Sequence, residues 1–146
     1  MRKAFVISST ALLFVFAFQF VFAAVGAFTR PQSDSSYALH SLTGMAIIPA
    51  LTVLTTVFAL LARAPGRLIG LTVLPLGLTI LQALLAVLAD AFAGASGGST
   101  TISLVVGGLH AVNGIVAVHF VVAAVRGARE LDRPRASVPA DSVEVA

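Results

Sequence analysis

Four long apolar stretches alternate with short polar connections along the chain. The apolar stretches cover roughly residues 4–28, 37–62, 68–93 and 102–125. Each is long enough for a transmembrane α-helix, which needs about 20 apolar residues to cross a hydrocarbon core of about 30 Å. The pattern therefore predicts an all-α membrane protein, with a four-helix transmembrane bundle as one domain over residues 1–126.

The connections between the stretches carry residues that end helices. The first is polar, the second holds Pro65 and Gly66, and the third is rich in glycine and serine over residues 94–100. Proline and glycine stop a helix and let the chain reverse. From residue 127 onward the chain is polar with mixed charge, so over 127–146 we expect a frayed helix end followed by a disordered cytoplasmic tail.

Composition supports lipid as the solvent of this chain. Hydrophobic residues make up 58% and charged residues 10%, whereas soluble domains average about 25% charged residues. Most basic residues precede the first stretch, lie in the second connection or follow the last stretch: Arg2, Lys3, Arg63, Arg67, Arg126, Arg129, Arg133 and Arg135. This positive-inside pattern predicts that both termini are cytoplasmic. The positive charge follows the connections, so it does not indicate a nucleic-acid partner.

The N-terminus has a second interpretation, a cleaved signal peptide. Arg2 and Lys3 precede an apolar run that contains small residues near its end. The apolar core of a signal peptide is about 7–15 residues long, whereas this run extends from Ala4 to Phe28. Its length favours a first transmembrane helix.

The string Leu-His-x-x-x-Gly occurs twice, from Leu39 to Gly44 and from Leu109 to Gly114. An ionisable side chain inside a membrane segment is costly and usually serves a function. The chain has no cysteine, which excludes disulfides, cysteine-ligated iron–sulfur clusters and covalently attached c-type haem. Histidine is then the remaining candidate metal ligand.

The two histidine segments are each preceded by a segment with one glutamine, Gln19 or Gln82. This order predicts two tandem helix hairpins in a parallel pseudo-repeat, related by an axis along the membrane normal. Such an axis would make His40 and His110 face each other at similar depth. The repeat requires the second segment to begin earlier than its apolar run suggests, near Ser33.

Two facing imidazoles could supply both axial ligands of one b-type haem near the outer leaflet. A glycine four residues after each histidine leaves a notch on the same helix face. Thr43 and Asn113 occupy matching places and could bond to an imidazole N–H, a histidine backbone or a propionate. We expect His40 and His110 as metal ligands, in a cofactor site completed by Gly44, Gly114, Thr43, Asn113, Gln19 and Gln82.

The alternative interpretation is helix packing without a cofactor. Small residues let membrane helices approach, and His, Asn, Gln and Thr side chains bond across them. His119, near the inner interface, fits helix bonding or snorkelling better than ligation, although a role toward a quinone stays open. Asp90 lies near the end of its segment and can reach water. The membrane segments hold no paired carboxylates, which argues against a carboxylate-relay pump.

The motifs resemble those of a group of small uncharacterised bacterial four-helix membrane proteins. The shared features are Leu39 to Gly44, Ala62 to Arg67, Leu81-Gln82 and Leu109 to Gly114. The resemblance covers about residues 1–130 and implies the bacterial plasma membrane, with no activity attached. More loosely, the layout is similar to cytochrome b561-type proteins and to one half of haem A synthase, which have more haem ligands than this chain offers.

Two functional hypotheses follow. The first is a protein that holds one haem b for electron transfer or haem handling, with a membrane redox partner or quinone. The second is a non-catalytic membrane subunit or scaffold, in which the chain oligomerises or stabilises a larger complex. An enzyme acting on a lipid-soluble substrate is a third hypothesis, and a self-contained enzyme is the less favoured one.

Overall fold

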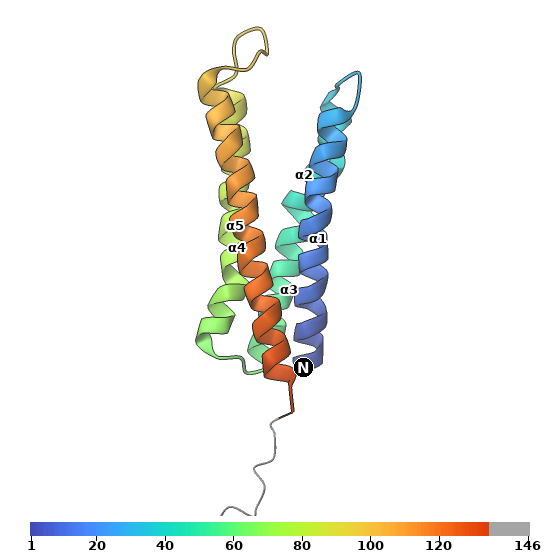
Figure 1. Ribbon diagram of the computed structural model, residues 1–146, viewed down its shortest axis with the longest axis vertical. Coiled ribbons are helices and arrows are strands. Elements are labelled where there is room, and N and C mark those ends of the chain that lie inside the picture. The colour runs from blue at the N-terminus through green and yellow to red at the C-terminus, as the bar shows by residue number, and fades with distance from the viewer. Residues whose placement is uncertain (135–146) are drawn as a thin grey trace, which may run out of the picture.

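The computed structural model describes residues 1–134 and consists of four long helical spans (Figure 1). Three spans are single helices: α1 (Arg2–Phe28), α4 (Gly66–Ala91) and α5 (Thr101–Asp132). The second span joins four shorter pieces end to end, namely η1 (Asp34–Tyr37), α2 (Ala38–Leu42), η2 (Thr43–Ile47) and α3 (Ile48–Leu61). All four spans are long and apolar enough to cross a membrane, which confirms the all-α, four-span prediction.

Two boundaries differ from the sequence prediction. The second span begins at Ser35 rather than at residue 37, because the polar residues of η1 already form a helical turn capped by Ser33. Helix α5 continues beyond residue 125 to Asp132, so residues 127–132 are helical and not part of a disordered tail. Ala128 explains this extension, since it is fully buried and docks the end of α5 on the bundle. The predicted tail over 135–146 lies outside the described residues.

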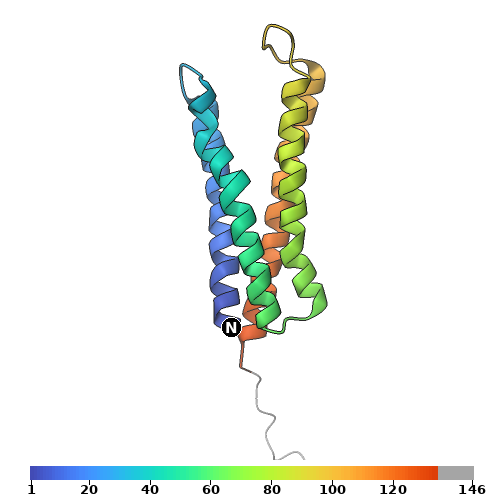
Figure 2. The same cartoon turned by 180° about the vertical axis from the view of Figure 1, so that it is seen from behind.

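The spans form two antiparallel hairpins that pack side by side. Helix α1 pairs with the second span, α4 pairs with α5, and the ring closes through contacts of α1 with α5 and of α3 with α4. Both views show the hairpins close together at the end that carries the N-terminus and diverging toward the opposite end (Figures 1 and 2). The orientation of these ends across a membrane and the axis relating the hairpins stay predictions.

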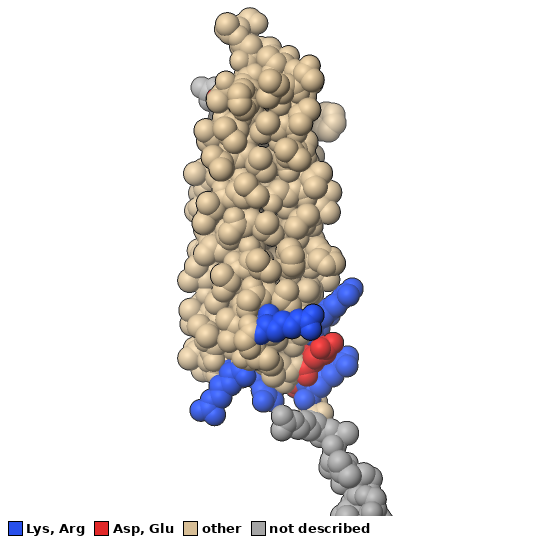
Figure 3. All heavy atoms as spheres, turned by 90° about the vertical axis from the view of Figure 1, so that its left-hand side faces the viewer, with Lys and Arg blue, Asp and Glu red and all other residues tan. Residues whose placement is uncertain are grey.

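We call the end that carries the N-terminus the basic end and the opposite one the far end. At the basic end, the start of α1 meets the connection from α3 to α4 and the end of α5. Lys and Arg side chains gather around this basic end (Figure 3). The chain turns between α3 and α4 with Arg63 in a left-handed conformation at φ 55. The N–H of Ala64 bonds back to the carbonyl of Ala59 and that of Arg63 to Leu60, which satisfies the last carbonyls of α3.

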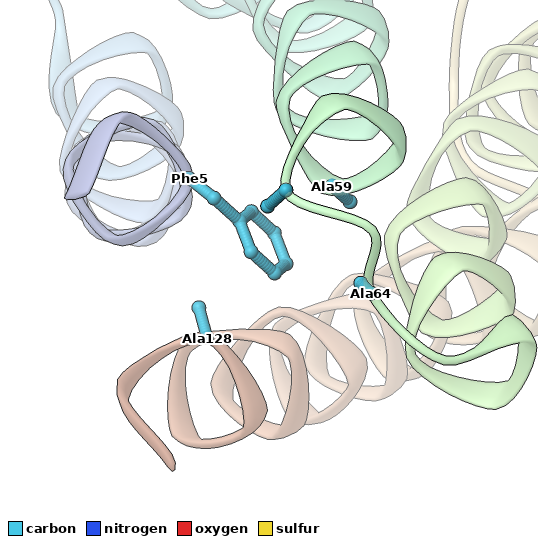
Figure 4. Packing of buried hydrophobic residues seen from close by; sticks show 5 residues of the cluster. Phe5, Ala59, Ala64 and Ala128 are labelled. Atoms are coloured by element: carbon cyan, nitrogen blue, oxygen red, sulfur yellow. The ribbon is translucent and has the colours of Figure 1, made fainter. Parts of the chain in front are cut away.

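A cluster centred on Phe5 holds the basic end together. Phe5 is fully buried against Ala59, Ala62, Ala64 and Ala128. Figure 4 shows its ring reaching from α1 into the space between the α3–α4 turn and α5. Small alanine partners let three spans approach this one aromatic ring, as membrane helices generally require.

We expect Phe5→Ala to destabilise the bundle by about 2 kcal/mol. Lipid tails are as apolar as the core, so the main cost is the cavity left behind, about 24 cal/mol for each Å³. Phe18→Ala is the matched control, because Phe18 is 55% exposed and should be close to neutral. Unfolding in mixed detergent micelles measures both variants, and equal losses would contradict the central position of Phe5.

Buried hydroxyl side chains, which the sequence analysis did not single out, fill the middle of the bundle. Ser9, Thr52, Thr55 and Thr72 are each at most 1% exposed. Three of them bond to a carbonyl three or four residues earlier in their own helix, which satisfies the hydroxyl without another helix. Ser9, Thr52 and Thr72 therefore serve as small packing groups, whereas the buried hydroxyl of Thr55 has no hydrogen-bond partner among the described residues.

The second span departs from regular helix just before Pro49. Residues of η2 form a π-helical turn in which the N–H of Ile48 bonds to the carbonyl of Thr43. Pro49 has no N–H to donate to a carbonyl in the preceding turn. The π-helical turn gives the carbonyls before Pro49 a different hydrogen-bonding pattern. The irregular turn lies directly after the segment that carries His40.

Candidate functional site

The first polar pair of the site joins α1 to α2. Nε2 of Gln19 donates a hydrogen bond of 2.8 Å to the backbone carbonyl of His40. The Nδ1 atom of His40 lies 3.1 Å from the backbone carbonyl oxygen of Gln19, so Nδ1 must carry the proton. Each residue thus bonds to the backbone of the other, and the two contacts fix the imidazole ring on α2.

The same pair of contacts recurs between α4 and α5. Nε2 of Gln82 donates to the carbonyl of His110 at 2.8 Å, and Nδ1 of His110 lies 3.0 Å from the carbonyl oxygen of Gln82. Both glutamines lie beside the histidines, as their order in the sequence predicts. The bond from the imidazole to the glutamine backbone was not predicted, because no residue pattern reveals which carbonyls face a neighbouring helix.

The two imidazole rings meet between the hairpins. Their centres are 6.2 Å apart and their planes are tilted by 47°, as the prediction of facing histidines requires. Within residues 1–134 the hydrogen bonds of both rings involve Nδ1 alone. The Nε2 atoms are therefore free to bind something else.

A cavity of about 500 Å³ surrounds the two rings and is lined by both hairpins. Its walls are mostly apolar, with many alanines that leave room between the helices. The lining includes Ala23 and Ala27 of α1, Ala83 and Ala86 of α4, and Ala111 and Ala117 of α5. Its size falls within the range of about 300–1,000 Å³ typical of ligand pockets.

Side chains of neighbouring helices occupy the glycine notches. A Cβ atom on Gly44 would lie 2.7 Å from Nε2 of Gln19, so Gly44 makes room for the glutamine amide. At Gly114 the nearest atoms are Nε2 of Gln82 at 3.5 Å and a ring carbon of Phe20 at 3.7 Å. Of these two glycines, only Gly44 lies so close to its neighbour that an added methyl group would collide with the glutamine amide.

Thr43 and Asn113 are both buried, at 4% and 9% exposure. Among the described residues neither side chain bonds to an imidazole N–H or to a histidine backbone, two of the three expected partners, and the third, a propionate, stays a prediction. Nδ2 of Asn113 donates to the carbonyl of Leu78 and to Oε1 of Gln82. Thr43 makes no corresponding hydrogen bond to the amide oxygen of Gln19. Oε1 of Gln19 is therefore buried without a hydrogen-bond partner among the described residues. The two halves of the site therefore differ in this one polar contact.

Tyr37 also belongs to the site, although the sequence analysis did not identify it. Its ring lies edge-on to His40 with centres 6.3 Å apart, and it lines the cavity. A Cβ on Gly26 would lie 2.5 Å from this ring, so the glycine allows the close approach. The position of this tyrosine three residues before His40, one helical turn away, is a signal that could have identified it.

The remaining candidates lie away from the cavity. His119 and Asp90 are exposed on their helices and do not line it, in agreement with the interpretation that they are not ligands. In the described part of the chain, no three His, Cys, Asp or Glu side chains gather into a metal-binding group. Among the described residues, the side chains of these types that line the cavity are His40 and His110.

The fold and the site define the class of this chain, a four-helix, multi-pass membrane protein with a mostly apolar pocket between its hairpins. The chain belongs to a family of unknown function, DUF6220, whose model matches residues 19–91. The match includes Gln19, His40 and Gln82 but ends before His110, so it is shorter than the stretch 1–130 that the motifs suggested.

No curated protein and no solved structure matches the chain. The looser resemblance to cytochrome b561-type proteins and haem A synthase therefore has no support from these comparisons.

Proposed function

We propose that this protein holds one b-type haem between its two hairpins, with His40 and His110 as axial ligands. The observation that carries the proposal is where the polar contacts lie. Both Gln–His pairs close within one hairpin, whereas the two rings face each other across the hairpins with free Nε2 atoms. Helix packing alone explains the Gln–His pairs, but it leaves the Nε2 atoms of both imidazoles without a partner.

The separation of the rings fits a single shared metal atom. A metal–imidazole bond is about 2.0–2.1 Å and a nitrogen lies about 1.1 Å from its ring centre, so two trans imidazoles on one metal have centres about 6.3 Å apart. The distance between His40 and His110 is 6.2 Å. A quinone ring bonded at both ends would need rings several ångströms farther apart, because each hydrogen bond alone spans about 2.8 Å.

The hydrogen bonds of the histidines also fit metal ligation. A ligating histidine almost always donates its other ring N–H to a carbonyl, a carboxylate or water, which fixes the tautomer and raises the basicity of the ligand. The carbonyls of Gln19 and Gln82 hold Nδ1 of the two rings in this way, which directs Nε2 to the metal.

The equatorial ligands are then expected from a planar ring that the protein does not itself provide. Two residues ligate, and the described chain adds no third of the usual metal-binding types nearby. A porphyrin supplies four nitrogens in a plane, and its apolar faces suit the alanine-lined walls of the cavity. No lysine or arginine among the described residues lines the cavity, so we expect the two carboxylates of the haem to point toward the polar connections at the far end.

When bound, the haem would supply one-electron redox chemistry or serve as cargo. The residues of this chain bind the metal, orient its ligands and keep water from its faces with apolar side chains. Burial in such surroundings and the strength of the Nδ1 hydrogen bonds set the potential of a haem. Electron transfer and haem handling both fit this arrangement, and neither requires a catalytic acid or base.

We expect purified protein to bind one haem per chain, with a Soret band that shifts on reduction. Ala86→Phe should lower haem occupancy at least about tenfold, because the added ring would fill the cavity while both ligands remain. Leu84→Phe is the control, since Leu84 is 53% exposed on the same helix and does not line the cavity. Absorbance and haem extraction measure all three proteins.

A different result would favour the scaffold hypothesis. Folded protein that stays colourless with added haem would remove the proposal. A wild type and an Ala86→Phe variant that bind haem equally would show that any haem lies elsewhere. Binding of a bare metal ion, equal in wild type and Ala86→Phe, would replace the porphyrin by a linear two-histidine metal site.

A further inference from the structure

The two ends of the proposed haem site differ in how firmly they hold their histidine. At His110, the amide oxygen of Gln82 accepts from Asn113, which also bonds to the carbonyl of Leu78. At His40, the corresponding oxygen of Gln19 is buried with no partner among the described residues. An unsatisfied buried acceptor is unfavourable, and a movement of the His40 segment that lets water reach this oxygen would relieve that cost.

The backbone is also less regular around His40 than around His110. His110 lies within α5, a continuous helix from Thr101 to Asp132. His40 lies in the five-residue helix α2, between the 3₁₀ turn η1 and the π-helical turn η2. Short irregular segments open at lower free energy than the interior of a long helix. Displacement of His40 breaks one Gln–His pair, whereas displacement of His110 disturbs the Asn113 contacts as well.

We propose that His40 is the exchangeable ligand, and that a small neutral molecule such as carbon monoxide binds the metal on its side. This rests on the proposed haem site. His110 stays in place as the permanent ligand, and the incoming molecule takes the coordination position that the imidazole of His40 vacates. The exchange replaces one neutral donor by another, so no charge or proton has to cross the cavity. The site then senses or carries a diatomic ligand in addition to holding haem.

The test uses reduced, haem-loaded protein titrated with carbon monoxide. Thr43→Asn places at the His40 end the residue type that Asn113 has at the other end, with nearly the same side-chain volume. The new amide should partner Oε1 of Gln19 and hold His40 more firmly, lowering the apparent affinity for carbon monoxide about fivefold or more. Thr101→Asn is the control for the same change of side chain, because Thr101 is exposed at the start of α5 and does not line the cavity.

A second comparison does not depend on how Thr43→Asn folds. With haem in excess, His40→Ala should still form a five-coordinate complex, although it binds haem more weakly than wild type, and should bind carbon monoxide more tightly than wild type, while His110→Ala should not take up haem. Equal haem loss in both variants, or the same carbon monoxide affinity in wild type and folded Thr43→Asn, would overturn the inference and leave the haem site standing. Failure of the wild type to take up any haem would instead refute the proposed function.

Discussion

His110→Ala should abolish haem binding, with occupancy at least about 100-fold below wild type, since a ligand contributes more than the 10–100-fold of its hydrogen-bond partners. The residue lies in the middle of a long helix and belongs to the fully hydrogen-bonded half of the site. Its loss would remove one of the two proposed metal ligands and leave the carbonyl of Gln82 without its N–H donor. Absorbance of the purified protein after haem titration measures the effect.

His119→Ala provides the matched control on the same helix. His119 lies nine residues beyond His110, is exposed and packs edge-on to Phe120 with ring centres 5.9 Å apart. We expect its Soret band to equal that of wild type. Loss of the band in His119→Ala, with His110→Ala unaffected, would show that the ligands have been assigned to the wrong histidine.

The sequence carried enough information to predict the helices because apolar length is a strong and local signal. Each span needs its backbone bonds satisfied within itself, so a run of apolar residues implies a helix wherever it occurs. The residues at which the helices begin and end were less predictable, since these boundaries depend on contacts between spans. Residues 127–132 are polar enough to suggest a tail, but burial of Ala128 against the Phe5 cluster extends α5 over them.

The pairing of His40 with His110 could also be predicted, because matching motifs in tandem hairpins place their residues in equivalent positions. The partners of the imidazoles could not. A backbone carbonyl has the same chemistry at every residue, so its choice by His40 is set by how α1 and α2 pack. The glycine pattern was noticed for the right reason, close approach, but the group that approaches is a glutamine amide.

The difference between the two halves was hidden for a related reason. Thr43 and Asn113 looked equivalent as small polar residues three positions after a histidine. In the structure only asparagine reaches the glutamine amide oxygen, through an N–H donor that also bonds to Leu78. Threonine offers a single hydroxyl on a branched carbon, and the acceptor of Gln19 stays unpaired. Thr43 and Asn113 therefore occupy matching positions in the sequence, but only Asn113 forms a hydrogen bond to the glutamine of its hairpin.

Gly44→Ala should disrupt the His40 half of the site, whereas Gly114→Ala should have little effect. The added methyl group on residue 44 would lie 2.7 Å from Nε2 of Gln19, so the amide must leave the carbonyl of His40 and the imidazole loses its orientation. On residue 114 the nearest atom would be at 3.5 Å, an ordinary contact. Alanine favours helix by about 1 kcal/mol over glycine, which makes any loss at residue 44 a consequence of the collision.

The two alanine variants are compared by haem titration and by unfolding in mixed micelles. We expect Gly44→Ala to weaken haem binding about tenfold or more, as for loss of a hydrogen-bond partner of a ligand, and Gly114→Ala to stay within about twofold of wild type. Combining Gly44→Ala with Gln19→Ala should remove the collision and restore helix stability, but not haem affinity, because the amide that holds the His40 backbone is gone. Equal behaviour of the two single variants would mean that the Gln19 pair does not orient His40.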